Sequence, residues 1–165
     1  MTYFWHNFCK YVCKKPLIFT NMKKILLFLV TITLSLTACA DNQQLVGYDQ
    51  LPVVAQTFIR KYFNPSDVTY IERERDGVHH DYNVYLKNSV EIDFDHQGNL
   101  ESIDCNRSPV PEGIVPELIT SFVSLHYPEQ IIVEYIVNYR SLDVELRNGL
   151  DLVFDLEGHF VRVDD

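Results

Sequence analysis

The stretch "DYNVYLKNSVEIDFDHQGNLESID", residues 81–104, has a counterpart 60 positions later in "SLDVELRNGLDLVFDLEGHFVRVD", residues 141–164. Apolar residues alternate with polar ones in both stretches, which is typical of β-strands with one buried face. Such repetition decides how the rest of the chain is interpreted. Placed over one another without gaps, the stretches are identical at Val84/Val144, Leu86/Leu146, Asn88/Asn148, Phe94/Phe154, Asp95/Asp155, Gly98/Gly158 and Asp104/Asp164.

A helix is predicted before each stretch. In "LPVVAQTFIRKYFNPSD", residues 51–67, apolar residues recur at helical spacing, Pro52 suits the first turn, and Asn64-Pro65 ends the helix. At an offset of 64, Pro52 pairs with Pro116 and Phe58 with Phe122. Strands are expected in the first copy at 68–75, 82–87, 90–95 and 100–104.

These elements predict an α+β fold. We expect a tandem duplication of a helix plus a four-stranded antiparallel sheet, with the helices packed on one face of the sheet. Repeat one spans residues 51–105 and repeat two residues 110–165.

The segment "DFDHQGNLESID", residues 93–104, imitates an EF-hand loop, which needs oxygen ligands at fixed positions and a glycine at the sixth. The second copy keeps Phe-Asp-x-x-Gly but has Val153 and Val161 at the first and ninth positions. We therefore interpret both segments as hairpin turns, in which aspartate accepts backbone hydrogen bonds and glycine takes a positive φ. No metal or cofactor is expected.

The front of the chain indicates export. From Met22, "MKKILLFLVTITLSLTAC" has two lysines, an apolar run and small residues before Cys39, so residues 22–38 are predicted to be a signal peptide. Leu36-Thr37-Ala38-Cys39 resembles the lipobox of bacterial lipoproteins, which makes Cys39 the expected lipidation site and residues 39–50 a tether. The alternative is ordinary secretion. Residues 1–21 are interpreted as an upstream start-site artefact.

Charge and cysteines exclude several classes of function. All 23 acidic residues follow position 40, where only nine Lys and Arg accompany them, giving a net charge of −14 that disfavours nucleic acid. Cys9 and Cys13 lack further metal ligands. If Cys39 is acylated, Cys105 has no disulfide partner and is expected to be a structural thiol.

The sequence contains no recognisable catalytic constellation. It has no Gly-x-Ser-x-Gly elbow and no phosphate-binding loop. His79 and His80 are adjacent, and side chains of adjacent strand residues point to opposite faces, so they are interpreted as part of a polar loop. The acidic pairs Glu91/Asp93 and Glu145/Asp151 could serve acid–base chemistry, but alternation places them on a solvated face.

The motifs "KYFNPSDV", "YNVYLKNSVEIDFDHQGN" and "LDVELRNGLDLVFDLEGHF" resemble the β-lactamase-inhibitor-like, PepSY-like family of Bacteroides-type bacteria. The resemblance covers Leu51 to Asp165 and implies a fold similar to β-lactamase inhibitory protein, but no established activity. Ser89 departs from the family pattern, because glycine is expected in that turn, and Cys105 is unpaired.

We therefore expect a non-enzymatic, lipid-anchored envelope protein, periplasmic or attached to the outer membrane, that binds a protein or peptide. The alternatives are an inhibitor or regulator of an envelope hydrolase and a structural or small-ligand carrier. Exposed aromatic and charged side chains on a rigid sheet favour protein contacts. The expected contact residues, from strand alternation alone, are Tyr85, Lys87, Glu91, Asp93, Glu145, Arg147 and Asp151.

Overall fold

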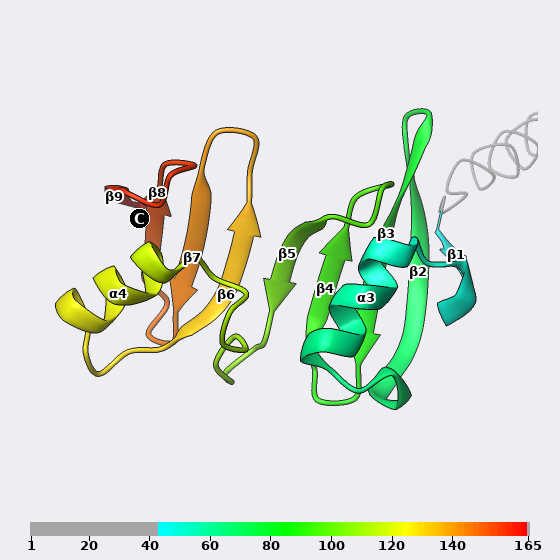
Figure 1. The fold of residues 1–165 in the computed structure, drawn as a ribbon, viewed down its shortest axis with the longest axis horizontal. Coiled ribbons are helices and arrows are strands. Elements are labelled where there is room, and N and C mark those ends of the chain that lie inside the picture. Colours follow the sequence, from blue (N-terminus) through cyan, green and yellow to red (C-terminus); the bar gives the residue numbers. More distant parts are fainter. Residues whose placement is uncertain (1–42, 165) are drawn as a thin grey trace, which may run out of the picture. The chain divides into compact units, whose positions relative to one another are not determined.

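The computed structural model of the chain describes residues 43–164. Nine strands form one antiparallel sheet in the order β1 to β9 (Figure 1). The strands are β1 Gln44–Leu45, β2 Val68–Asp76, β3 His79–Leu86, β4 Glu91–Phe94, β5 Leu100–Asp104, β6 Ile132–Val137, β7 Leu142–Leu146, β8 Asp151–Phe154 and β9 Phe160–Asp164. The α-helices of this part are α3 Val53–Tyr62 and α4 Glu117–His126, and the short 3-10 helices are η1 Tyr48–Gln50 and η2 Pro65–Asp67.

The predicted fold class, a tandem α+β unit with a four-stranded sheet in each copy, is wrong. The strands form a single nine-stranded sheet because β5 pairs directly with β6, with Ile103 opposite Tyr135. Alternation identifies the strands but does not say which edges meet, so the sequence could not separate two sheets from one. β1, from the segment expected to be a tether, pairs with β2 and adds the ninth strand.

The structure corrects the expectation for the two adjacent histidines and does not describe the predicted export signal. His79 and His80, interpreted as a loop, belong to β3. The predicted start-site artefact, signal peptide and Cys39 lie outside the described residues. Between residues 43 and 164, no helix has both the length and the apolar character needed to span a bilayer.

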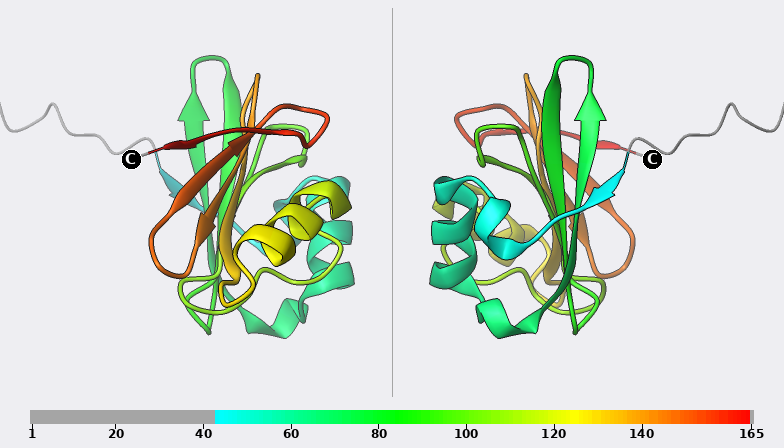
Figure 2. Two further views of the ribbon diagram at one scale, coloured as in Figure 1. Left: turned by 90° about the vertical axis from the view of Figure 1, so that its left-hand side faces the viewer. Right: turned by 90° about the vertical axis from the view of Figure 1, so that its right-hand side faces the viewer.

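Both α-helices pack on the same face of the sheet (Figure 2). One row of directly opposed side chains on this face runs from β2 to β8 and supplies the centre of the core. Its members are at most 5% exposed. They are Ile71, Val84, Ile92, Ile103, Tyr135, Val144 and Leu152.

The aromatic residues shared by the two copies occupy matching positions. Phe94 and Phe154 are both fully buried. Phe94 meets Phe58 of α3 edge-on at 5.5 Å between ring centroids, and Phe154 meets Phe122 of α4 edge-on at the same separation. Aromatic pairs in this arrangement add about 1 kcal/mol to the free energy gained from burial. Each helix is therefore fixed to its strands by an equivalent contact.

The shared glycines explain how closely the helices approach the turns. Gly98 has φ +88°, and a Cβ there would lie 2.9 Å from the Ala55 backbone nitrogen in α3. Gly158 has φ +89°, and its Cβ would lie 3.3 Å from Leu118 Cβ in α4. Both positions thus require glycine for conformation, and Gly98 also for space.

The turn between β3 and β4 has a strained backbone at Ser89, where the sequence departs from the expected glycine. Ser89 follows β3 with φ +61°, whereas its counterpart Gly149 has φ +80° in an uncrowded position. A left-handed conformation costs a residue with a Cβ about 1–2 kcal/mol. The same backbone shape is therefore more costly in the first turn than in the second.

Exchanging these residues tests the strain. We expect Ser89→Gly to stabilise the fold by about 1 kcal/mol and to raise Tm by a few degrees, because glycine adopts the positive φ freely. Gly149→Ser should lower stability by a similar amount. Thermal unfolding of both variants measures the effect, and a Ser89→Gly variant no more stable than the parent would contradict it.

Candidate binding face

The face of the sheet opposite α3 and α4, called the open face below, carries an unbroken line of carboxylates. Successive strands place these residues directly opposite one another from β4 to β9. We call this line the acidic row: Glu91, Asp104, Glu134, Glu145, Asp151 and Asp164. Tyr85 continues it on β3, opposite Glu91, and its ring stacks on that of Tyr70 at 4.4 Å between centroids.

The acidic row is electrostatically costly, since like charges directly opposed on neighbouring strands destabilise a sheet. Its effect is clearest at Glu134, in the centre. Partial burial, then a hydrogen bond with Glu145 and the charges of Asp104, Glu145 and Asp151, raise the pKa of Glu134 to about 7. Glu134 thus keeps its proton to a higher pH than an isolated glutamate does, and the charges around it are repulsive.

A second carboxylate on the open face, that of Asp93, also has a raised pKa. Asp93 lies on β4 two positions after Glu91 of the acidic row, and burial is the main reason that its pKa is raised. Its Oδ2 accepts a 2.6 Å hydrogen bond from Ser102 Oγ, while its buried Oδ1 has no hydrogen-bond partner among residues 43–164. A hollow of about 300 Å³ lies beside it. The hollow is lined by Glu74, Arg75, Asp81, Asn83, Asp93 and Glu101.

The structure gathers most of the sequence-predicted contact residues. Tyr85, Glu91, Glu145 and Asp151 are aligned along one line of the open face, and Asp93 is beside them. Lys87 is placed elsewhere.

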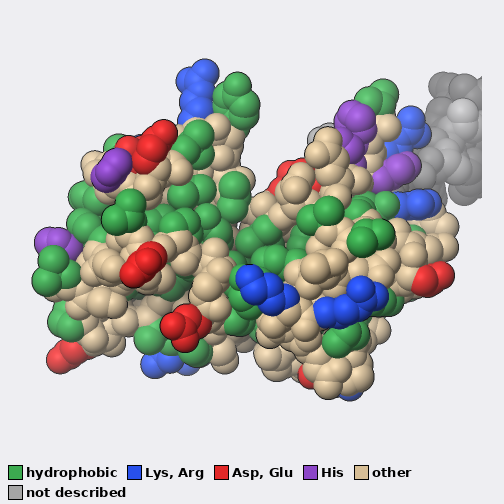
Figure 3. Space-filling model, in the orientation of Figure 1, with side chains coloured by type: hydrophobic (Ala, Val, Ile, Leu, Met, Phe, Trp, Pro, Cys, Tyr) green, Lys and Arg blue, Asp and Glu red, His purple; other side chains and the backbone are tan. Residues whose placement is uncertain are grey.

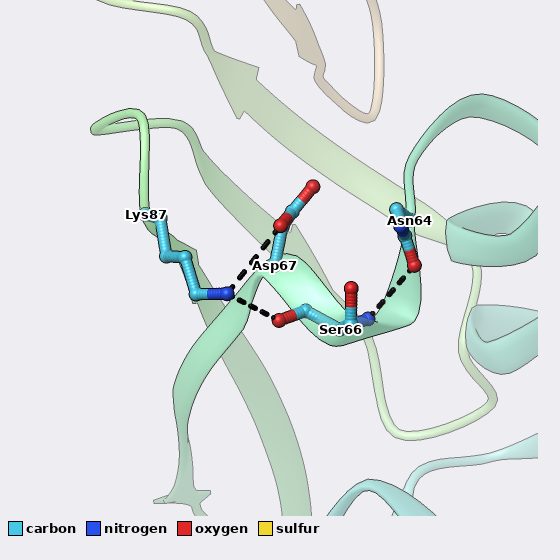
Figure 4. Close-up of polar contacts among 4 residues, drawn as sticks. All are labelled: Asn64, Ser66, Asp67 and Lys87. Carbon is cyan, nitrogen blue, oxygen red and sulfur yellow. Dashed lines mark hydrogen bonds and ion pairs between the residues drawn. The ribbon is translucent and has the colours of Figure 1, made fainter.

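Lys87 follows β3 and contacts the η2 turn. Its Nζ donates to the Ser66 carbonyl oxygen at 2.7 Å and lies 3.5 Å from Asp67 Oδ1 of η2 (Figure 4). Asn64 caps the same turn by accepting a hydrogen bond from the Ser66 N–H. Arg147 follows β7 in an exposed turn. Lys87 therefore supports the η2 turn and does not belong to the acidic row.

Sequence reasoning missed the members of the row that lie next to the junction of the two copies. Asp104 opposes Glu134, and Glu134 opposes Glu145. Asp164 closes the row on β9. The equivalence of Asp104 and Asp164 across the two copies was visible, but only the β5–β6 register makes them part of one line.

The two EF-hand-like segments are hairpin turns between neighbouring strands. Asp95 Oδ1 accepts hydrogen bonds from the Gln97 and Asn99 backbone N–H groups at 2.8 Å, and Oδ2 accepts one from Asn99 Nδ2. Asp155 makes the equivalent bonds to Glu157 and His159. These bonds lower the pKa of both aspartates. The hairpin interpretation is confirmed, because each turn joins two paired antiparallel strands and its aspartate holds the turn closed.

The free thiol of the described part is buried. Cys105 is 2% exposed, and burial, followed by the charge of Asp104, raises its pKa to about 11, which suppresses the thiolate. Among residues 43–164, no group of three or more His, Cys, Asp or Glu side chains is arranged to hold a metal ion.

Another hollow, a groove of about 1330 Å³, lies beside α4. It runs along the connection 109–116 and the chain before β6. Its apolar lining includes Val110, Ile114, Val123, Leu125 and Ile132.

Comparisons with known proteins agree with the resemblance noted in the sequence. The family model described as "Putative beta-lactamase-inhibitor-like, PepSY-like" matches residues 38–100 and 80–162. A search of the curated proteins gave no match.

Solved structures from Bacteroides are similar in fold and sequence. A "putative calcium-regulated periplasmic protein" from Bacteroides thetaiotaomicron is 31% identical with a TM-score of 0.72, the match covering 76% of this chain and 99% of that one. A "putative periplasmic protein" from Bacteroides vulgatus is 29% identical with the same coverage and TM-score. A third, also from Bacteroides vulgatus, is 30% identical over 74% and 99% of the two chains, with a TM-score of 0.71. All are described as periplasmic, which supports the predicted export of this chain.

Removing the central carboxylate should stabilise the sheet in a pH-dependent way. The pKa of Glu134 is raised in the folded state. The contribution of Glu134 to the stability of the fold is therefore fully present below pH 4.5 and is lost as the pH rises to about 7. We expect Glu134→Gln to raise Tm by a few degrees at pH 8, where a like-charge contact costs up to about 1 kcal/mol, and to change it little at pH 4.5.

Thermal unfolding across this pH range measures the difference. Glu112→Gln, in the exposed connection before α4, makes the same chemical change away from the acidic row and should leave Tm unchanged at both pH values. Equal effects of Glu134→Gln at the two pH values would contradict the repulsion inferred here.

Proposed function

Because this chain belongs to the β-lactamase-inhibitor-like, PepSY-like family, we propose that it is a non-enzymatic envelope protein that binds an extended, lysine- or arginine-rich segment of a partner on its open face. The observation that supports this proposal is the acidic row, six carboxylates in direct register across six strands. Because these carboxylates repel one another, a positively charged ligand that neutralises them stabilises the sheet.

The dimensions of the row suit a short polypeptide. Neighbouring strands are about 4.8 Å apart, so the row from Glu91 to Asp164 is about 24 Å long. An extended segment of about seven or eight residues covers this distance. Basic side chains at alternate positions of such a segment point the same way and face the carboxylates. The stacked Tyr70 and Tyr85 add an aromatic surface at one end, where a cation can rest on a ring face.

The proposal of a binding role without catalysis rests on the chemistry of the face. Its acidic groups repel one another, and the buried thiol of Cys105 is protonated at neutral pH. The family description names an inhibitor-like protein. A metal is not part of the proposal, because the aspartates of the EF-hand-like turns are bound within the turns.

Attachment to the membrane is the second part of the proposal. The segment from Leu36 to Cys39 has the lipobox pattern, and several acyl chains on Cys39 would anchor the protein stably. Palmitate labelling that disappears in Cys39→Ala tests this attachment. An anchored domain with an open acidic face would capture basic segments of other envelope proteins.

Two other roles have an observation in their favour. The family description favours an inhibitor of an envelope hydrolase, which would bind its enzyme through the same face. The groove beside α4 favours a carrier of an apolar ligand. A carrier predicts ligand binding that is insensitive to salt, whereas capture of a basic segment weakens as salt increases. An inhibitor predicts that adding the protein lowers the activity of a peptidase or β-lactamase.

The proposal is tested with a defined peptide. An eight-residue peptide of alternating Lys and Ser should bind the protein, while the peptide with Glu in place of Lys should not. Affinity measured by calorimetry should fall at least several-fold between 50 and 300 mM NaCl. Adding Ca²⁺ in a parallel titration reports whether the calcium regulation described for one relative extends to this chain.

Two variants of equal charge separate the row from net charge. Glu145→Lys lies in the centre of the acidic row and should weaken peptide binding about tenfold or more, since it removes one carboxylate contact and adds a repulsive one. Glu112→Lys changes net charge equally but lies outside the row. Equal losses for the two variants would mean that the peptide senses total charge and that the row is not the site.

A further inference from the structure

Among residues 43–164, no strand pairs with the outer edge of β9. β9 pairs with β8 on one side, and all five of its residues are exposed. Hydrophobic side chains gather around α4 and the neighbouring end of the sheet (Figure 3). Phe160 and Val163 of β9 are each 39% exposed, and Leu118 of α4 is 56% exposed. An unpaired strand of this kind is a template for another strand.

The backbone groups on that edge can be assigned from the ladder. The Leu146 N–H donates to the Leu150 carbonyl oxygen, and the Asp155 N–H donates to the His159 carbonyl oxygen. Residues of an antiparallel strand alternate in direction, so Asp151 and Val153 bond toward β9, where their partners are Asp164 and Arg162. Val163 lies between these two residues, so its N–H and C=O groups point outward from the sheet.

The first copy shows what covers such an edge. β5 is the counterpart of β9, and its Ile103, equivalent to Val163, is fully buried because β6 pairs with it. The Cys105 N–H donates to the Val133 carbonyl oxygen across that junction at 2.8 Å. The same type of edge is thus covered by an antiparallel strand in the first copy and is open in the second.

We propose that β9 pairs with β9 of a second copy of this chain, antiparallel, around a two-fold axis at Val163. In that register Arg162 of each copy lies opposite Asp164 of the other on the open face, and the two Val163 side chains meet on the helix-bearing face. Arg162 already lies 3.0 Å from Asp164 of its own strand, which shows that the two charges fit one another on this surface. A two-fold axis makes the contact self-complementary and closed. The pairing also buries the outward backbone groups of Val163.

Charge reversal tests this pairing. Light scattering on the full chain in mild detergent, with a reductant, should give a polypeptide mass that rises toward that of two chains as the protein concentration increases. Arg162→Asp and Asp164→Arg should each remain monomeric, because two acidic or two basic pairs then face one another. An equimolar mixture of the two variants should recover the dimer. The double exchange Arg162→Asp/Asp164→Arg should dimerise like the parent.

Each result decides the question. Both side chains are more than half exposed, so folding should be unchanged, which circular dichroism verifies. Val163→Pro is a second variant: it removes an N–H that points outward, is tolerated at an edge, and should abolish dimerisation. A parent chain that remains monomeric up to about 1 mM, single variants that dimerise normally, or a mixture that stays monomeric would overturn the proposal.

Discussion

The pairing of β5 with β6 is the constraint on which the rest of the structure depends. Three residue pairs, Ser102 with Ile136, Ile103 with Tyr135 and Asp104 with Glu134, join strands that precede and follow α4. Their helix-facing side chains are buried and continue one core row across the junction. Two arrays that could each have formed a small sheet therefore share one core and one open face.

This junction also creates the candidate site. It sets Asp104 beside Glu134, which connects the carboxylates of the first copy with those of the second. Glu134 responds with a pKa raised to about 7, since the surrounding acids disfavour another negative charge. Burial of apolar side chains on the helix-bearing face thus stabilises the β5–β6 pairing, whereas repulsion among the carboxylates of the open face destabilises it. The tension between the two faces is the physical reason for expecting a basic ligand.

Local features could be predicted from the sequence, and long-range register could not. Phe94 with Phe154, and Gly98 with Gly158, were identified by repetition and occupy equivalent places. Turn chemistry identified Asp95 as the residue that accepts the hydrogen bonds of the β4–β5 turn. The fold class was wrong because alternation fixes the face of a side chain but not the neighbouring strand. Asp104 and Glu134 were missed for the same reason, and the contact of Lys87 with the η2 turn was not predicted.

Amide hydrogen exchange at the junction measures the central claim most directly. If β5 and β6 form one continuous ladder, the Cys105 N–H, which donates to the Val133 carbonyl oxygen, should be protected as strongly as the Leu146 N–H, which donates to the Leu150 carbonyl oxygen between β7 and β8. Exchange at Cys105 as fast as in an exposed turn, with Leu146 still protected, would show that the two copies are separate sheets. The acidic row would then be broken at its centre.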